Sequence, residues 1–209
     1  VNPLSINIEA GRKHWAYQPL QAPAIPAVKT TSWPINDIDR FVLAKLESAG
    51  LQPGSPAKKI TLIRRLYFDL IGLPPTPEEI ARFVDDKSPE AYQDLVDRLM
   101  KSPRFGERWG RHWLDVSRFA ESMSLRGRIL KHAWRYRDYV IDAFNNDKPF
   151  DQFLTQQLAG DLLETSSVEA QRQNRIATTY LVMGDALLEN QNKSQLDMDV
   201  VDEQLDTIG

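Results

Sequence analysis

Three helix-start signals in close succession constrain this fold more than any other feature of the sequence. Each places a serine or threonine directly before a proline, at Thr76-Pro77, Ser88-Pro89 and Ser102-Pro103. The hydroxyl of such a residue can cap the first free N–H groups of a helix. Proline suits the first helical position because it lacks an N–H. Starts this close together predict short helices joined by tight corners.

Apolar residues recur at helical spacing through the rest of the chain, and no segment shows convincing strand alternation. Glycines that would end helices follow two of these patterns, at Gly50 and Gly72. The predicted helices span residues 36–49, 56–71, 77–85, 134–145, 149–163 and 171–183, with further helices opening at Ser88 and Ser102 and one within 185–209. The fold class is therefore predicted to be all-α, an irregular orthogonal bundle of eight to nine short helices.

The first 34 residues carry few regular signals. Helices are interrupted there by Pro19, Pro23, Pro26 and Pro34, and Trp15 and Tyr17 alternate as on a strand. We expect residues 1–34 to form an extended N-terminal arm that lays these aromatic rings on the helical body. Residues 35–209 are expected to form a single helical domain.

Composition narrows the classes of function. The chain has 209 residues, 42% of them hydrophobic, and a formal net charge of −3, which gives no reason to expect nucleic-acid binding. No apolar run approaches the length of a membrane span, and the first residues lack the pattern of a signal peptide. The absence of cysteine excludes disulfides, cysteine-ligated metals and covalently attached haem within these residues.

A basic and aromatic segment lies at the centre of the chain, from Ser102 to Asp138. It holds nine Lys or Arg residues, four acids and three of the five tryptophans. Phe105, Trp109, Trp113 and Val116 recur at helical spacing, which predicts that they share one core-facing side of a helix. Residues 122–133, around Gly127, are predicted to form a loop or a short extended excursion, which is where a mobile or ligand-facing element is expected.

No standard catalytic or metal-binding motif occurs in the sequence. There is no phosphate-cradling glycine loop, HExxH, GxSxG or EF-hand loop. A triad of Ser117 or Ser122 with His112 and Asp115 has no support in their local order. The acids of the last segment are spaced as on a solvated helix rather than a calcium loop, so no metal site is predicted.

Paired arginines in the basic segment are candidates to bind an anion. Guanidinium groups match carboxylate, sulfate and phosphate geometry, which makes Arg135 and Arg137 candidate ligand-binding residues together with Glu121 and Asp138. The alternative is structural: each of these acids lies near an arginine, and an arginine lowers the pKa of a neighbouring carboxyl group, as in an ordinary ion pair.

A string of motifs resembles one known family. The motifs are HWAYQPL, WPINDIDRFVLAKLESAGL, LIRRLYFDLIGLPPTPEEI, SPRFGERWGRHWLDVSRFAES, AWRYRDYVIDAFNNDKPFDQFLTQQLAGDLL and MDVVDEQLDTIG. Together they are similar to the planctomycete cytochrome-associated family, a family of unknown function. The resemblance covers nearly the whole chain, from about His14 to Gly209.

The resemblance implies an exported protein, periplasmic or on the cell surface, with c-type haem in a segment downstream of DEQLDTIG in the parent protein. It implies no cofactor held by this chain itself. His112, Trp109 and Trp113 are then expected near that haem, with Arg118 among the arginines that meet its propionates. The expected partners are the downstream domain of the same protein and a redox partner.

Three functions therefore stay open at this stage. The first is a non-catalytic helical module that supports electron transfer by a downstream haem segment. The second is a module that binds polysaccharide or another anionic ligand. The third is an uncharacterised enzyme with an Arg/Asp/Glu cleft, whose catalytic residues the sequence does not identify. The first predicts exposed apolar residues near the C-terminus, and the third predicts carboxylates that converge in a closed pocket.

Overall fold

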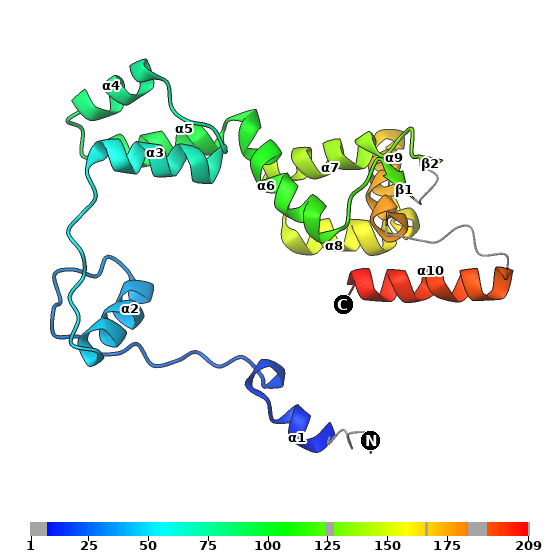
Figure 1. Cartoon of the computed structure of the whole chain (residues 1–209), viewed down its shortest axis with the longest axis horizontal. Helices are drawn as coiled ribbons and strands as arrows, with labels where there is room; N and C mark the ends of the chain where they lie inside the picture. The colour runs from blue at the N-terminus through cyan, green and yellow to red at the C-terminus, as the bar shows by residue number, and fades with distance from the viewer. Residues whose placement is uncertain (1–7, 124–127, 166, 184–191, 209) are drawn as a thin grey trace. The chain divides into compact units, whose positions relative to one another are not determined.

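The structure is a computed structural model that describes residues 8–123, 128–165, 167–183 and 192–208 (Figure 1). The chain forms two compact units, one that ends at Pro56 and one that begins at Ala57. Each unit has its own helices and is described separately. The single domain expected over residues 35–209 stays a prediction.

The first unit holds α1 (Ile8–Arg12), η1 (Trp15–Tyr17) and α2 (Asp37–Ser48). The strand-like alternation predicted for Trp15 and Tyr17 is wrong. His14 caps a turn of 3-10 helix there, because its Nδ1 accepts the N–H of Ala16 at 3.3 Å. Both aromatic side chains are exposed, by 81% and 76%.

Helix α2 begins and ends where the local signals predict. Asn36 and Asp39 form a reciprocal capping box at its N-terminus. Gly50 follows its C-terminus with φ +70°, a left-handed conformation that glycine adopts without steric cost. The carboxylate of Glu47 accepts the backbone N–H groups of Lys29 and Thr30, and the hydrogen bond from Lys29 is the first cause of a lowered Glu47 pKa.

The second unit is a chain of short helices, as predicted. These are α3 (Lys59–Leu70), α4 (Pro77–Asp85), α5 (Ala91–Met100), α6 (Pro103–Val116), α7 (Trp134–Asn145), α8 (Phe150–Ala159), η2 (Gly160–Leu162), α9 (Val168–Ala177), η3 (Thr178–Val182) and α10 (Lys193–Ile208). The start expected at Ser88-Pro89 is wrong, because α5 begins at Ala91, after Glu90, with no side-chain hydrogen bond at its cap. Thr76 and Ser102 cap α4 and α6 with their hydroxyls, and Pro77 and Pro103 are the first helical residues. The all-α fold class is therefore confirmed.

Two short strands, each of two residues, lie between α6 and α7 in the described chain. Ser122–Met123 (β1) runs antiparallel to Arg128–Ile129 (β2), with Ser122 opposite Ile129. The predicted short extended excursion at 122–133 is confirmed at these residues. Its centre at Gly127 lies outside the described residues.

The second unit buries two apolar clusters. One lies among α3, α4 and α5 and includes Ile63, Tyr67 and Leu95. The other lies among α7, α8, α9 and η3, and is larger and mostly aromatic. Its buried members are Ala133, Tyr136, Tyr139, Val140, Ala143, Phe153, Ala177, Tyr180 and Met183.

Helix α6 packs on α7 through glycines, which corrects the predicted core face. Trp109 and Val116 are 38% and 66% exposed, whereas Gly106 and Gly110 are buried. A Cβ atom on Gly106 would lie 2.4 Å from the carbonyl oxygen of Ile141, so only glycine permits this approach. The prediction was wrong for Trp109 and Val116, because close contact between backbones, rather than side-chain size, selects this buried face of α6; Trp113 is partly buried and packs against the core.

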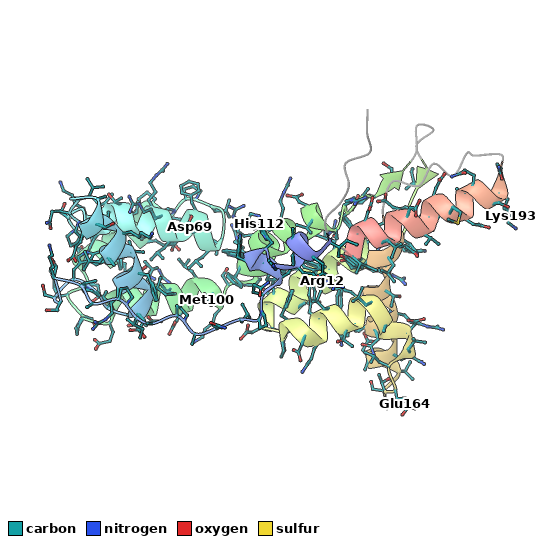
Figure 2. The ribbon with its side chains drawn as sticks, turned by 90° about the horizontal axis from the view of Figure 1, so that it is seen from below. Arg12, Asp69, Met100, His112, Glu164 and Lys193 are labelled. Atoms are coloured by element: carbon teal, nitrogen blue, oxygen red, sulfur yellow. The ribbon has the colours of Figure 1, made fainter. Side chains whose placement is uncertain are left out.

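Helix α10 confirms the helix predicted in the acidic C-terminal segment; Figure 2 labels Lys193 at its first turn. It meets the rest of the unit through Arg118, which forms an ion pair with Glu203, and Tyr180, which donates to the carbonyl oxygen of Thr207. No described helix combines the length and the apolar character that crossing a bilayer requires.

Candidate anion-binding site

A pocket of about 420 Å³ lies beside α7 and α9 in the second unit. Its volume falls within the roughly 300–1,000 Å³ of small-molecule sites. It is lined by His132, Arg135, Val168, Gln171, Arg172, Arg175, Ile176 and Thr179. Three of these eight residues are arginines and none is acidic, so the lining carries a formal charge of +3 with neutral histidine.

Local helical geometry brings these arginines to the pocket. Arg172 and Arg175 are three residues apart on α9, so they lie on one face of that helix. Arg135 is the second residue of α7, and α7 packs on α9. Gly160 precedes α9 and allows a close approach, because a Cβ there would lie 2.3 Å from the carbonyl oxygen of Asn174.

The three guanidinium groups lack carboxylate partners among the described residues. No salt bridge joins Arg135, Arg172 or Arg175 to a described acid. The Nε of Arg135 is buried and has no hydrogen-bond acceptor within the described chain. Its guanidinium lies 5.5 Å from the centroid of the Trp134 ring. A buried donor without an acceptor costs about 1–3 kcal/mol, and Arg108 Nε on α6 is in the same situation.

The four predicted ligand-binding residues separate into two groups. Arg137 donates to Glu121 Oε1 at 3.1 Å and to Asp138 Oδ1 at 3.1 Å, so the charge of this arginine is compensated by two carboxylates at the surface. Arg135 lies apart from them and lines the basic pocket. The acids of the predicted Arg/Asp/Glu cleft therefore meet Arg137, and none of them lines the pocket of Arg135.

The prediction missed Arg172, Arg175 and His132. The available signal was the spacing of the two arginines in QRQNRIA, which places both on one side of a short helix. Only the packing of α9 against α7 turns that local pattern into a site with Arg135.

The residues predicted near haem do not share a pocket in the described chain. Trp113 is bound into the core, because its Nε1 donates to Tyr136 Oη and Gln157 Oε1, each at 3.0 Å. Arg118 is paired with Glu203. His112 is exposed on α6, where Figure 2 labels it, with its ring centroid 5.5 Å from that of Trp109. These residues therefore do not form a haem pocket by themselves, and contact with a haem outside the chain stays a prediction.

Residues of the types that bind metal ions do not cluster in the part of the chain that the structure describes. No group of three or more histidine and acidic residues has an arrangement that could hold a metal ion there. The basic pocket concentrates positive charge without an acidic residue in its lining.

Comparison with known proteins places the chain in a family without assigning it an activity. No curated protein and no solved structure gives a significant match. The family model PSCyt2, described as a protein of unknown function (DUF1549), matches residues 37–209. This match covers all of α2 to α10, including the residues of the basic pocket. The chain therefore belongs to the PSCyt2 (DUF1549) family of proteins of unknown function.

Proposed function

We propose that this protein is a helical module that binds an anionic ligand in the pocket beside α7 and α9. The observation that carries the proposal is the set of three arginines around one pocket that contains no acidic residue. Uncompensated positive charge in a concave site favours carboxylate, sulfate or phosphate groups over neutral ones.

The lining also sets the character of the ligand. Guanidinium groups bind the oxygens of such anions in pairs, and the Arg135 Nε is already desolvated. Gln171 and Thr179 supply neutral hydrogen-bonding groups, and Val168 and Ile176 supply apolar surface. The pocket therefore suits an anionic group attached to a larger polar body, such as an acidic sugar of a polysaccharide, better than a bare inorganic ion.

The test measures anion binding to the full chain and to a variant with less charge in the pocket. Inorganic sulfate and phosphate are titrated by calorimetry at constant ionic strength, with chloride as the reference anion. Arg172 and Arg175 are both exposed, so the double substitution Arg172→Ala/Arg175→Ala should fold. We expect the double variant to bind either anion at least tenfold more weakly.

A matched control removes the same charge elsewhere. Arg104 and Arg111 are exposed on α6, and Arg104→Ala/Arg111→Ala should leave anion affinity unchanged. Equal loss of binding in both double variants would reduce the effect to net charge and would sink the proposal. Absence of saturable binding in the unmodified chain would do the same.

A second candidate is the expected helical module of an exported protein that supports electron transfer by a downstream haem segment. The observation in its favour is the apolar stripe of α10, where Met198, Val201, Leu205 and Ile208 lie at spacings of three and four and are 47–61% exposed. Such a stripe is commonly covered by another segment or partner. A reduced-minus-oxidised absorption spectrum of the protein extended past Gly209, made in a host that attaches haem, tests this role. A folded product without c-type bands would exclude it.

A further inference from the structure

A second pocket lies among α6, α7 and α8, apart from the basic one. Its volume is about 230 Å³. It is lined by Phe105, Trp113, Ala143, Phe144, Asp147, Lys148, Phe150 and Phe153. None of these residues lines the anion pocket, so what binds here does not depend on the function proposed above.

Five aromatic rings form most of this lining. Trp113 and Phe153 meet edge to face with centroids 4.9 Å apart, and Phe150 meets Trp113 at 6.3 Å. Trp113 is fixed by its hydrogen bonds to Tyr136 and Gln157, so this wall is held in place before any ligand arrives. A cavity of about 150 Å³ with an apolar lining admits benzene. The larger volume here admits one six-membered ring and a few further atoms.

The remaining polar residues of the lining carry opposite charges and are adjacent in sequence. Asp147 has φ +47°, a left-handed conformation that aspartate tolerates better than most residues. This turn directs the chain from α7 to α8, and the N–H of Lys148 donates to the carbonyl oxygen of Ala143 at 2.9 Å. The turn therefore places one acidic and one basic residue in the lining of the same aromatic pocket.

The ammonium group of Lys148 has neutral partners only among the described residues. Its Nζ donates to Gln156 Oε1 at 2.7 Å and lies 4.5 Å from the centroid of the Tyr139 ring. No described acid forms a salt bridge with it. Burial lowers the Lys148 pKa, and the charge of Asp142 opposes that shift. A partly desolvated cation of this kind gains from a ligand carboxylate.

We propose that this pocket binds a small aromatic zwitterion, such as an aromatic α-amino acid. The ring occupies the space among the aromatic side chains, the ligand carboxylate meets Lys148, and the ligand ammonium meets Asp147. An aromatic acid without an amine would leave the Asp147 carboxylate facing a second negative charge. An aromatic amine without a carboxylate would leave Lys148 unpaired, so the zwitterion satisfies both residues together.

The test compares four probes on the full chain by calorimetry: L-phenylalanine, 3-phenylpropanoate, phenethylamine and glycine. We expect phenylalanine to bind at least tenfold more tightly than either compound that lacks one charge, and glycine to show no binding. Equal affinities for phenylalanine and either singly charged probe would overturn the proposal. So would the absence of saturable phenylalanine binding.

Two substitutions separate the roles of the charged residues. Lys148→Met keeps the length of the stem and should weaken phenylalanine and 3-phenylpropanoate while leaving phenethylamine unchanged. Asp147→Asn keeps a residue that tolerates the left-handed conformation, and it should weaken phenylalanine and phenethylamine only. A loss shared equally by all probes in either variant would contradict the assignment, because misfolding rather than lost charge would then explain it.

A third variant removes part of the ring site. Phe150 is 65% exposed at the start of α8, so Phe150→Ala should fold and should lose at least tenfold in affinity for every aromatic probe. The Arg172→Ala/Arg175→Ala variant should bind phenylalanine as the unmodified chain does. Retained phenylalanine affinity in Phe150→Ala would place the ligand elsewhere and would overturn the proposal.

Discussion

Helix α7 has two sides that are built differently. Toward α6 it packs backbone against glycine, and the Asn145 amide joins the helices by accepting the N–H of Gly106 at 2.8 Å and donating to the carbonyl oxygen of Pro103 at 3.1 Å. Toward α9 it presents Arg135, whose buried Nε has no described acceptor, beside two further arginines. The first side packs the fold, and the second is the side on which we propose that an anionic ligand binds. Substitutions on one side of α7 should therefore have different effects from substitutions on the other.

The largest effect is expected from Gly106→Ala on the α6 side. The new Cβ would lie 2.4 Å from the Ile141 carbonyl oxygen and 2.6 Å from Asn145 Cγ. A backbone atom cannot move aside as a side-chain end can, so α6 must separate from α7 and the Asn145 bridge must weaken. We expect a loss of about 2–4 kcal/mol in the free energy of unfolding, measured with urea.

Gly110→Ala is the matched control for that substitution. Its Cβ would first meet Val140 Cγ1 at 3.4 Å, which is a side-chain atom at near-ordinary contact distance. Because alanine favours helix over glycine, the change should stay within about 1 kcal/mol of zero. Equal destabilisation by the two alanines would show that helix separation does not limit stability at Gly106.

A smaller loss is expected when the buried hydrogen bonds below α7 are broken. Gln157 is fully buried and accepts from both Trp113 Nε1 and Tyr136 Oη. Gln157→Leu preserves approximate volume but leaves a buried donor without its acceptor. We expect about 1–3 kcal/mol of destabilisation by urea unfolding. The substitution Gln93→Leu at an exposed position of α5 would hardly change stability; if it cost as much, the buried network would not be the cause.

Alkaline pH should lower the free energy of unfolding through a buried tyrosine of α7. Burial raises the pKa of Tyr136 to about 12, and the hydrogen bonds from Trp113 and Ser117 only partly oppose it. Between pH 10 and 12 the unfolded chain releases this proton before the folded one does, so stability is full below pH 10 and falls as pH rises toward 12. We expect Tyr136 to contribute about 2–3 kcal/mol to that fall.

Tyr136→Phe provides the comparison for the alkaline loss. Its unfolding free energy should decline less between pH 10 and 12 than that of the unmodified chain, when both are followed by circular dichroism in urea. Parallel pH profiles for the two proteins would assign the loss to other groups, of which Tyr67, with a pKa raised to about 12, is the first to test.

The sequence predicted where helices begin better than which face of each helix is buried. The starts of α4 and α6 were predictable because Thr76 and Ser102 cap N–H groups within their own first turn. The face of α6 was not, because glycine contributes no apolar signal and its value depends on a neighbour 35 residues away in sequence, at Ile141. Local chemistry fixes where a helix begins, and tertiary contact fixes which side is buried.

The candidate site was predictable in part for the same reason. Arg135 was identified from its place in a basic, aromatic segment, but Arg172 and Arg175 are distant in sequence and reach it only through the packing of α9 on α7. Conversely, Arg137 was a candidate because it lies two residues from Arg135. The opposite faces of a helix give such neighbours different surroundings, and Arg137 is neutralised by Glu121 and Asp138.

The smallest effects are expected from these two arginines, and they should have opposite signs. Arg135→Met removes a buried donor without an acceptor and reduces repulsion with Arg172 and Arg175, but it loses the contact with Trp134. We expect a gain of about 0.5–1 kcal/mol in buffer without multivalent anions. Arg137→Met loses its partly exposed ion pairs and should cost about 0.2–1 kcal/mol.

Urea unfolding with and without sulfate measures the stability change of both variants. Sulfate should stabilise the unmodified chain and Arg137→Met more than Arg135→Met. If Arg135→Met proves destabilising and responds fully to sulfate, then Arg135 serves packing rather than anion binding, and the two sides of α7 do not differ in purpose.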